Sequence, residues 1–133
     1  MLINSSPHEI TAELPWEERP PGIGGFNHVV ARPGSQTVLL VQRFDVNHMS
    51  GRFEFRPYAK DPLLVLGAHG EGRTAALMTD LAPHWVGGFV DWQDDARVKA
   101  KAPGSWEIEV GNLYAQFIAN LLTWTGQLAG VRV

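Results

Sequence analysis

The sequence contains no cysteine among its 133 residues. A chain without cysteine forms no disulfide, ligates no metal through a thiolate and supplies no cysteine nucleophile. An excess of positive charge is also missing, since 11 Lys and Arg stand against 14 Asp and Glu and the formal net charge is -3. Without a basic excess there is no long-range field to attract nucleic acid or anionic lipid. We therefore expect neither a nucleic-acid partner nor a membrane partner.

Long hydrophobic runs are missing as well. Apolar runs such as Leu63–Leu66 are far shorter than the roughly 20 apolar residues of a membrane-spanning helix. Residues 1–7 lack the charged and apolar regions of a secretory signal peptide. The expected location is the cytoplasm. A hydrophobic fraction of 44% with 19% charged residues is typical of a globular protein, and the length predicts a single domain over residues 1–133.

Glycine and proline divide the first part of the chain into segments. They are concentrated in residues 15–25, which we expect to form a loop. Residues 10–14 alternate weakly, as in a short strand or a single turn. The β-branched and leucine-rich run Val38–Val41 predicts a buried strand. After a turn expected at residues 47–51, residues 52–56 alternate strictly between apolar and charged side chains, which predicts an exposed strand or arm.

The clearest structural unit is a β-hairpin predicted over residues 62–79. Two apolar runs flank a glycine-bearing turn at Gly70–Gly72. Neither run alternates, which indicates strands buried on both faces, as in a layered α/β sheet. Residues 70–75 also fit the loose dinucleotide-binding pattern GxGxxA, which requires a helix after the glycines. Because residues 75–79 look more like a strand, we interpret this match as accidental and expect no cofactor.

A long irregular segment and one helix are expected in the remainder. Residues 80–105 contain two prolines and three glycines, and a loop of this length in a compact domain is usually functional or disordered. Apolar residues spaced by three and four predict a helix over residues 111–125, with Asn112 as its N-cap and Gly126 after its end. Its start is ambiguous, because residues 106–110 alternate as a strand would.

Candidate ligand-binding residues follow directly after the hairpin. Asp80, His84 and Trp85 stand where ligands bind in open α/β sheets, beyond the carboxyl end of a strand. They offer an acid–base group, a hydrogen-bond acceptor and a flat apolar wall. Asp91 and Trp92 of the same segment are candidate second contributors. The alternative is structural: Asp80 caps a turn and Trp85 covers the hydrophobic core.

The remaining reactive residues form no recognisable catalytic or metal-binding motif. None of the five histidines pairs with another at the spacing of four that a helical zinc site uses. A metal held by distant residues, such as His84 with Asp80 and Asp91, stays open as an alternative. The serine elbow pattern GxSxG is absent. We therefore assign no catalytic residue and expect no metal.

Several segments resemble one protein family. The most specific are Asp61–Gly67, Gly70–Arg73 and Thr79–Trp85, and looser ones are Pro7–Thr11, Gly25–Asn27 and Gly111–Asn112 leading Tyr114 to Trp124. They resemble the putative glutamine amidotransferases, a class I glutamine-amidotransferase-like family related to trehalose-utilisation-like proteins. The resemblance covers most of the chain.

The resemblance implies a particular fold and an incomplete active site. It implies an α/β fold: a partial flavodoxin-like sheet with a β-hairpin and one C-terminal helix, which corresponds to the later half of an amidotransferase-like domain. The first half, with the early parallel strands and the cysteine elbow, is expected to be missing. His84 corresponds to the histidine of the His-x-Glu pair in true class I enzymes, but Val86 stands in place of the glutamate. The chain is therefore not expected to hydrolyse glutamine by itself.

Three classes of function stay open. The chain is a non-catalytic module acting through assembly or small-molecule binding, a subunit or fragment of an enzyme whose active site another chain completes, or a purely structural product. One helix covers only one face of a sheet, so strands such as Val38–Val41 and Leu63–Leu66 are expected to be exposed. We therefore expect a homo-oligomer, most simply a homodimer, or a partner chain that supplies the missing first half.

Overall fold

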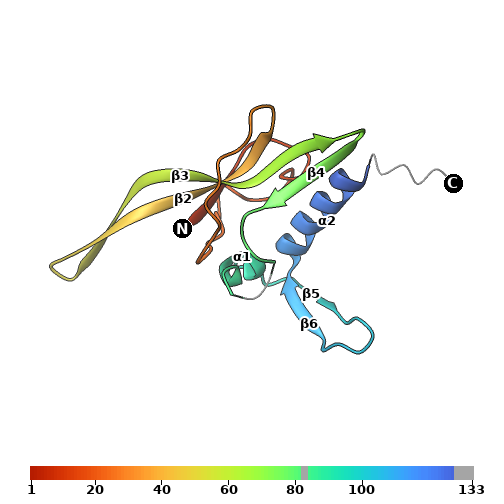
Figure 1. Ribbon diagram of the computed structural model, residues 1–133. Helices are drawn as coiled ribbons and strands as arrows, with labels where there is room; N and C mark the ends of the chain where they lie inside the picture. The colour runs from red at the N-terminus through yellow and green to blue at the C-terminus, as the bar shows by residue number, and fades with distance from the viewer. Residues whose placement is uncertain (82–83, 128–133) are drawn as a thin grey trace.

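The computed structural model describes residues 1–81 and 84–127. Within them, four strands form one sheet in the order β1-β2-β3-β4, and β5 pairs with β6 in a separate ribbon. The elements are β1 (Leu2–Ser5), β2 (Gln36–Met49), β3 (Arg52–His69), β4 (Gly72–Leu77), α1 (Gly87–Asp91), β5 (Arg97–Ala100), β6 (Ile108–Gly111) and α2 (Asn112–Gly126). Figure 1 shows α2 beside β4, with the β2–β3 hairpin and the β5–β6 ribbon projecting away from the body in different directions. Neither helix of the described residues has the length and hydropathy needed to cross a membrane.

The combination of a sheet with a packed helix agrees with the predicted α/β class. Every strand pairing among the described residues is antiparallel. Short turns join β2 to β3 and β3 to β4, and such turns permit only antiparallel pairing, because a parallel pair needs a crossover of a dozen or more residues. The parallel strands of a flavodoxin-like domain are therefore not among these pairings.

The hairpin predicted over residues 62–79 is confirmed. β3 pairs with β4 from Leu64 opposite Leu77 to His69 opposite Gly72. The turn between them contains Gly70 with a φ of 59°, which glycine adopts without steric cost. Since the residues after the glycines form a strand and not a helix, the GxGxxA match builds no phosphate-binding helix terminus.

β2 and β3 continue beyond the sheet as a two-stranded projection. β1 pairs with β2 only as far as Gln42, and β4 pairs with β3 only from Leu64 onward. We call residues Phe44–Pro57, which lie beyond both limits, the arm; its strands turn at Ser50 and Gly51, both at positive φ. The arm confirms the exposed strand that the alternation of residues 52–56 predicts.

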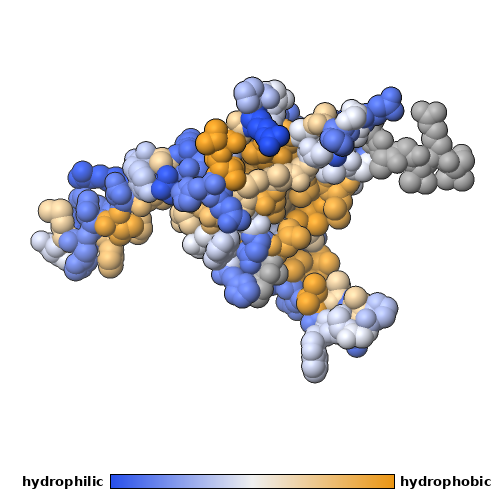
Figure 2. All heavy atoms as spheres, viewed as in Figure 1, coloured by the Kyte–Doolittle hydropathy of each residue, from blue (hydrophilic) through white to orange (hydrophobic). Residues whose placement is uncertain are grey.

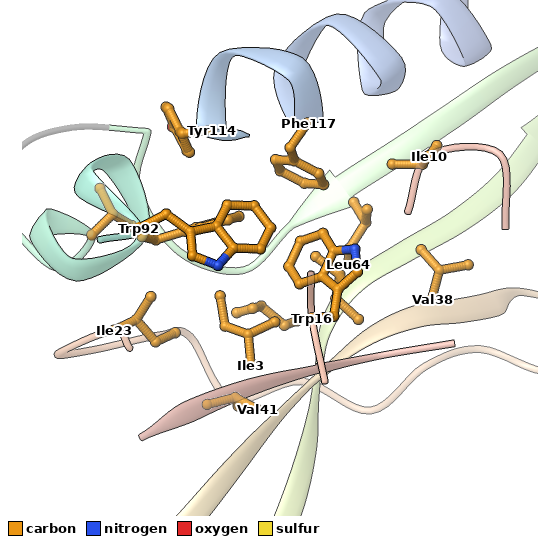
Figure 3. Packing of buried hydrophobic residues seen from close by; sticks show 14 of the residues in the cluster. Ile3, Ile10, Trp16, Ile23, Val38, Val41, Leu64, Trp92, Tyr114 and Phe117 are labelled. Atoms are coloured by element: carbon orange, nitrogen blue, oxygen red, sulfur yellow. The ribbon is translucent and has the colours of Figure 1, made fainter. Parts of the chain in front are cut away.

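The core is an aromatic cluster between the sheet and α2. The rings of Trp16 and Trp92 lie 4.5 Å apart, and the Trp16 and Phe117 rings lie 5.5 Å apart at nearly a right angle. Figure 3 shows both tryptophans between Phe117 on one side and Ile3 and Val41 on the other. The Trp16 indole N–H donates to the Thr11 carbonyl at 2.9 Å and the Trp92 indole N–H to the Arg19 carbonyl at 2.7 Å. Both buried polar atoms are thereby satisfied.

The expectation that the central strands are exposed is wrong. Side chains of both runs are buried within this single chain: Val38, Leu39, Val41, Leu63, Leu64 and Leu66. Much of the cover comes from the irregular N-terminal segment, whose Ile10, Trp16 and Ile23 belong to the same core cluster. An irregular segment buries a sheet face as well as a helix does when its backbone finds hydrogen-bond partners, as Ile23 N–H does on the Met1 carbonyl.

The segment 80–105 is less irregular than predicted, because it contains the short helix α1 and the strand β5. β5 pairs with β6, which confirms the strand-like alternation before the final helix. That helix begins at Asn112 with Gly111 at the N-cap, and it ends at Gly126, so the predicted N-cap and C-terminal positions are wrong by one residue. The Leu113 N–H instead donates to the Asp94 carboxylate at 2.8 Å. A remote carboxylate thus satisfies a free N–H of the first turn.

Candidate functional site

Asp80 organises the turn that follows β4. Its Oδ2 accepts the His84 N–H at 2.9 Å, and its Oδ1 accepts the Trp85 N–H at 3.2 Å. A carboxylate that accepts backbone N–H groups a few residues later stabilises a loop in the manner of an Asx turn. The structural role that the sequence leaves open for Asp80 is therefore real, and the same contacts hold His84 and Trp85 beside the carboxylate.

His84 and Trp85 differ in how they meet solvent. The His84 side chain is 83% exposed, and its Nδ1 lies 3.7 Å from Oδ2 of Asp80. Trp85 is 40% exposed, and the inner part of its ring lies against Gly25, where an added Cβ would come within 2.7 Å of ring atoms. The Gly24 N–H donates to the Trp85 carbonyl at 2.7 Å. Trp85 therefore packs on the 24–25 segment with one side and leaves part of its ring open.

The end of β4 is joined to residues 25–27 by two hydrogen bonds. The buried Thr79 hydroxyl donates to the Gly25 carbonyl at 2.8 Å, and the Asn27 N–H donates to the Met78 carbonyl at 2.7 Å. Two of the segments that resemble the family, Gly25–Asn27 and Thr79–Trp85, are thus adjacent in space although about fifty residues separate them in the chain. Their adjacency defines the candidate site.

Tyr114 of α2 also belongs to this site, although it was not among the predicted ligand-binding residues. Its hydroxyl donates to the Leu81 carbonyl at 2.8 Å. Burial, and to a smaller extent the negative charge of Asp80, raises the pKa of Tyr114 to about 12. The sequence feature that could have identified Tyr114 is a tyrosine on the apolar face of a helix, because a buried phenol requires a hydrogen-bond partner.

Asp91 and Trp92 have other surroundings. Asp91 Oδ1 lies 2.8 Å from Nη1 of Arg97, whose Nε also lies 3.0 Å from Glu109. The hydrogen bond to Glu109, followed by Asp91, raises the pKa of Arg97, and desolvation opposes both. Trp92 is buried in the aromatic core. Its ring presents no face to a ligand, and the Asp91 carboxylate is paired with Arg97, so the remaining candidates are Asp80, His84 and Trp85.

Metal-binding geometry is not present in the described part of the chain. No group of three or more His, Cys, Asp and Glu residues within 1–81 and 84–127 is arranged to hold a metal ion, and His84, Asp80 and Asp91 form no such group. What remains chemically is an exposed imidazole beside a carboxylate that accepts two N–H bonds. Such a pair can orient a polar ligand or exchange a proton with a group that approaches from solvent.

The family model described as putative glutamine amidotransferase matches residues 2–104. The matched range extends from β1 to β5 and includes the whole sheet, the Asp80 turn and α1. A search among curated proteins finds no significant match. Because the family model matches more than half of the residues, the chain belongs to the putative glutamine amidotransferase family.

Proposed function

We propose that this chain is a cytoplasmic, non-catalytic glutamine-amidotransferase-like module, the later half of a flavodoxin-like domain, which acts through assembly or small-molecule binding. One observation supports the non-catalytic role most strongly. The sequence has no cysteine to attack an amide, and the residue two positions after His84 is Val86, whose side chain is fully buried. The chain therefore lacks the cysteine nucleophile and the glutamate of the His-x-Glu pair, the two residues with which His84 would act in glutamine hydrolysis.

The environment of Val86 supports the same conclusion. Val86 precedes α1 and belongs to the hydrophobic core cluster. A glutamate in this place would put a carboxylate among apolar side chains, and a buried charge without a partner is strongly unfavourable. The position is therefore suited to packing and not to orienting a catalytic histidine.

For small-molecule binding, the proposed contacts are Asp80, His84 and Trp85. The imidazole is exposed, and the indole is open on part of its ring. A planar ligand with a polar edge would stack on Trp85 and hydrogen-bond to His84. In a fragment screen by NMR we expect the amide signals of residues 80, 84 and 85 to shift; shifts confined to other regions would contradict the site.

A second candidate function is an active site that another chain completes. The observation in its favour is the 3.7 Å approach of His84 to Asp80. In a catalytic triad the base is oriented by a third, acidic group, and Asp80 would act here in place of the glutamate. The exposure of His84 leaves it open to a nucleophile supplied from outside.

The test is release of ammonia from glutamine by the purified chain, compared with a heat-inactivated sample. We expect no release above that background. Release that His84→Ala abolishes, and that His28→Ala at another exposed histidine leaves unchanged, would overturn the non-catalytic role. If glutaminase activity appears only on adding a chain with the family's cysteine elbow, and requires both His84 and Asp80, the second candidate function is correct.

A further inference from the structure

The arm has one apolar and one polar face. Directly paired residues in an antiparallel ribbon project to the same side. The pairs 44–57, 46–55 and 48–53 alternate along the arm with the pairs 45–56, 47–54 and 49–52. The apolar face therefore consists of Phe44, Val46, His48, Phe53, Phe55 and Pro57, and the polar face consists of Asp45, Asn47, Met49, Arg52, Glu54 and Arg56.

The apolar face is open to solvent along most of its length. Phe53 is 65% exposed, Phe55 63% and Val46 53%. A two-stranded ribbon is only marginally stable in water unless a third strand or another surface packs on it. In Figure 2 hydrophobic residues lie beside hydrophilic ones along the projecting arm. The alternation of apolar and polar pairs along the arm is typical of a strand pair that has one face buried against another surface.

The base of the arm is hollowed on the same side. Met1, Leu2, Phe44, Val46 and Phe55 line a hollow of about 360 Å³ between the arm and the N-terminal strand. The apolar face thus has a projecting aromatic side chain near its tip, Phe53, and an apolar recess at its base. Strands rise about 3.4 Å per residue, so roughly 14 Å separates the 48–53 pair from the 44–57 pair.

We propose that the apolar face of the arm binds the same face of a second copy of this chain. This inference rests on the proposed function, in which the module acts through assembly, and it names the surface and the partner. A two-fold axis through the middle of the arm sets two arms antiparallel, so that the tip of each lies over the base of the other. Phe53 of one copy then enters the hollow of its partner, and both exposed phenylalanines are covered.

Charge favours a second copy as the occupant. A two-fold contact sets a surface against itself, so a net charge on that surface would be repulsive. The arm has Asp45 and Glu54 against Arg52 and Arg56, which is two charges of each sign. All four lie on the polar face, and an Arg56 nitrogen lies 3.4 Å from a Glu54 oxygen within the same arm. The apolar face contains only His48 as a titratable group.

The area available suits a reversible dimer. At roughly 200 Å² for a whole phenylalanine, each exposed ring of the arm offers about 130 Å², and two arms with Val46 offer on the order of 700 Å². Stable dimers bury about 1,200–2,000 Å² in total. An area below this range is typical of a weak, reversible contact, and we expect a dissociation constant on the order of micromolar.

Side-chain contacts and a register shift define the base of the arm. Arg43 Nε lies 2.7 Å from Asp61 Oδ2, and its Nη1 donates to the Tyr58 hydroxyl at 2.7 Å. The register shifts between Arg43 and Phe44, and such a bulge bends a strand and fixes a new direction. An arm with a fixed direction loses little conformational freedom when it binds.

The first experiment measures oligomeric state by light scattering over a concentration series. We expect a dimer for the wild-type chain and at least about a thirtyfold increase in the dissociation constant for the double variant Phe53→Ser with Phe55→Ser. Met49→Ser is the matched control, because Met49 is equally exposed at the tip but lies on the polar face. It should leave the constant unchanged, and circular dichroism should show that each variant is folded.

The second experiment uses the absence of cysteine in the wild-type chain. Val46 lies at the middle of the apolar face, next to the proposed axis, so Val46→Cys should form a disulfide-linked dimer on mild oxidation. Asn47→Cys, one residue along and on the polar face, should stay monomeric in the same denaturing gel. Any crosslink arises from the introduced thiol alone.

Two results would overturn the proposal. A wild-type chain that stays monomeric up to about 100 µM, well above a micromolar dissociation constant, excludes a second copy as the occupant. A dimer that persists in the double serine variant and gives no Val46→Cys crosslink assembles through another surface. In that case the assembly role stands and the arm is not its contact. Ammonia release tests the non-catalytic role independently of both results.

Discussion

The body and the arm of this protein contain the same kinds of side chain in opposite surroundings. Phe117 in the body is fully buried against Trp16 and Phe89, whereas Phe53 in the arm is 65% exposed. Both residues belong to elements with one apolar face. The body has α2 and the N-terminal segment to cover that face, whereas the described residues leave Val46, Phe53 and Phe55 of the arm largely exposed. The sequence pattern thus indicates which face of an element is apolar. Whether that face is buried depends on the other elements or chains that pack against it.

The largest expected effect is in the body. Phe117→Ala should lower the free energy of unfolding by about 3–5 kcal/mol, because it removes a ring from the centre of the core and leaves a cavity. Urea denaturation measures the difference. Trp106→Ala is the control: Trp106 is exposed on the loop between β5 and β6, and the change should stay within about 0.5 kcal/mol. Equal effects of the two substitutions would show that the core is misplaced.

A second effect concerns the close approach of α1 to the N-terminal segment. A Cβ on Gly88 would lie 2.7 Å from the Gly22 carbonyl oxygen. Gly88→Ala should therefore destabilise the body by about 1–3 kcal/mol in thermal or urea unfolding, since backbone must move. The neighbouring Gly87 has no atom within 4 Å of such a Cβ, and Gly87→Ala should be neutral or slightly stabilising, by less than about 1 kcal/mol. A Gly88→Ala variant as stable as Gly87→Ala would contradict this packing.

A third effect is a dependence of stability on pH that arises from Tyr114. Its pKa is about 12 in the folded chain against 10.0 for a free tyrosine, so the folded state holds the phenolic proton more tightly than the unfolded state. Stability present below pH 10 should therefore fall, by on the order of 1–2 kcal/mol, as the pH rises from 10 through 12. Tyr114→Phe should remove this component from pH-dependent urea unfolding.

The control for that prediction lies at the base of the arm. Tyr58→Phe changes an exposed tyrosine and leaves the surroundings of Tyr114 intact, so the loss of stability should persist. If both variants unfold with the same dependence on pH as the wild type, the Tyr114 phenol is not in the buried environment described above.

The smallest effect is expected in the arm. In solutions dilute enough to keep the chain monomeric, Phe53→Ala should change the free energy of unfolding by less than about 0.5 kcal/mol, because the ring has few contacts to lose. The same phenylalanine-to-alanine change thus costs several kcal/mol in α2 and almost nothing in the arm. A destabilisation above about 2 kcal/mol at low concentration would mean that the arm packs on its own chain.

The sequence predicts those parts of the fold that depend on local pattern. The β3–β4 hairpin follows from two apolar runs around a glycine turn, and the arm follows from the alternation of residues 52–56. α2 follows from apolar spacings of three and four. The start of α2 is less predictable, because the Leu113 N–H donates to Asp94, which lies nineteen residues earlier in the chain. Local sequence contains no information on a cap supplied from elsewhere.

The candidate site was predictable only where it depends on local sequence. Asp80, His84 and Trp85 are neighbours in sequence, and the structure keeps them together through the two bonds to Asp80. Tyr114 and Gly25 reach the site from distant segments. Their contribution depends on how α2 and the N-terminal segment pack, and no local pattern specifies that packing.

By itself, the sequence determined which catalytic groups are absent and which faces of the strands and helices are apolar. It has no cysteine and has a valine two residues after His84, and its alternation separates Phe53 from Arg52 across the arm. Only the tertiary structure decided which apolar faces are covered: the N-terminal segment covers the central strands, whereas Phe53 and Phe55 of the arm stay exposed. The physical reason is that residue order sets side-chain direction within an element. Burial depends on contacts between elements that are far apart in the sequence.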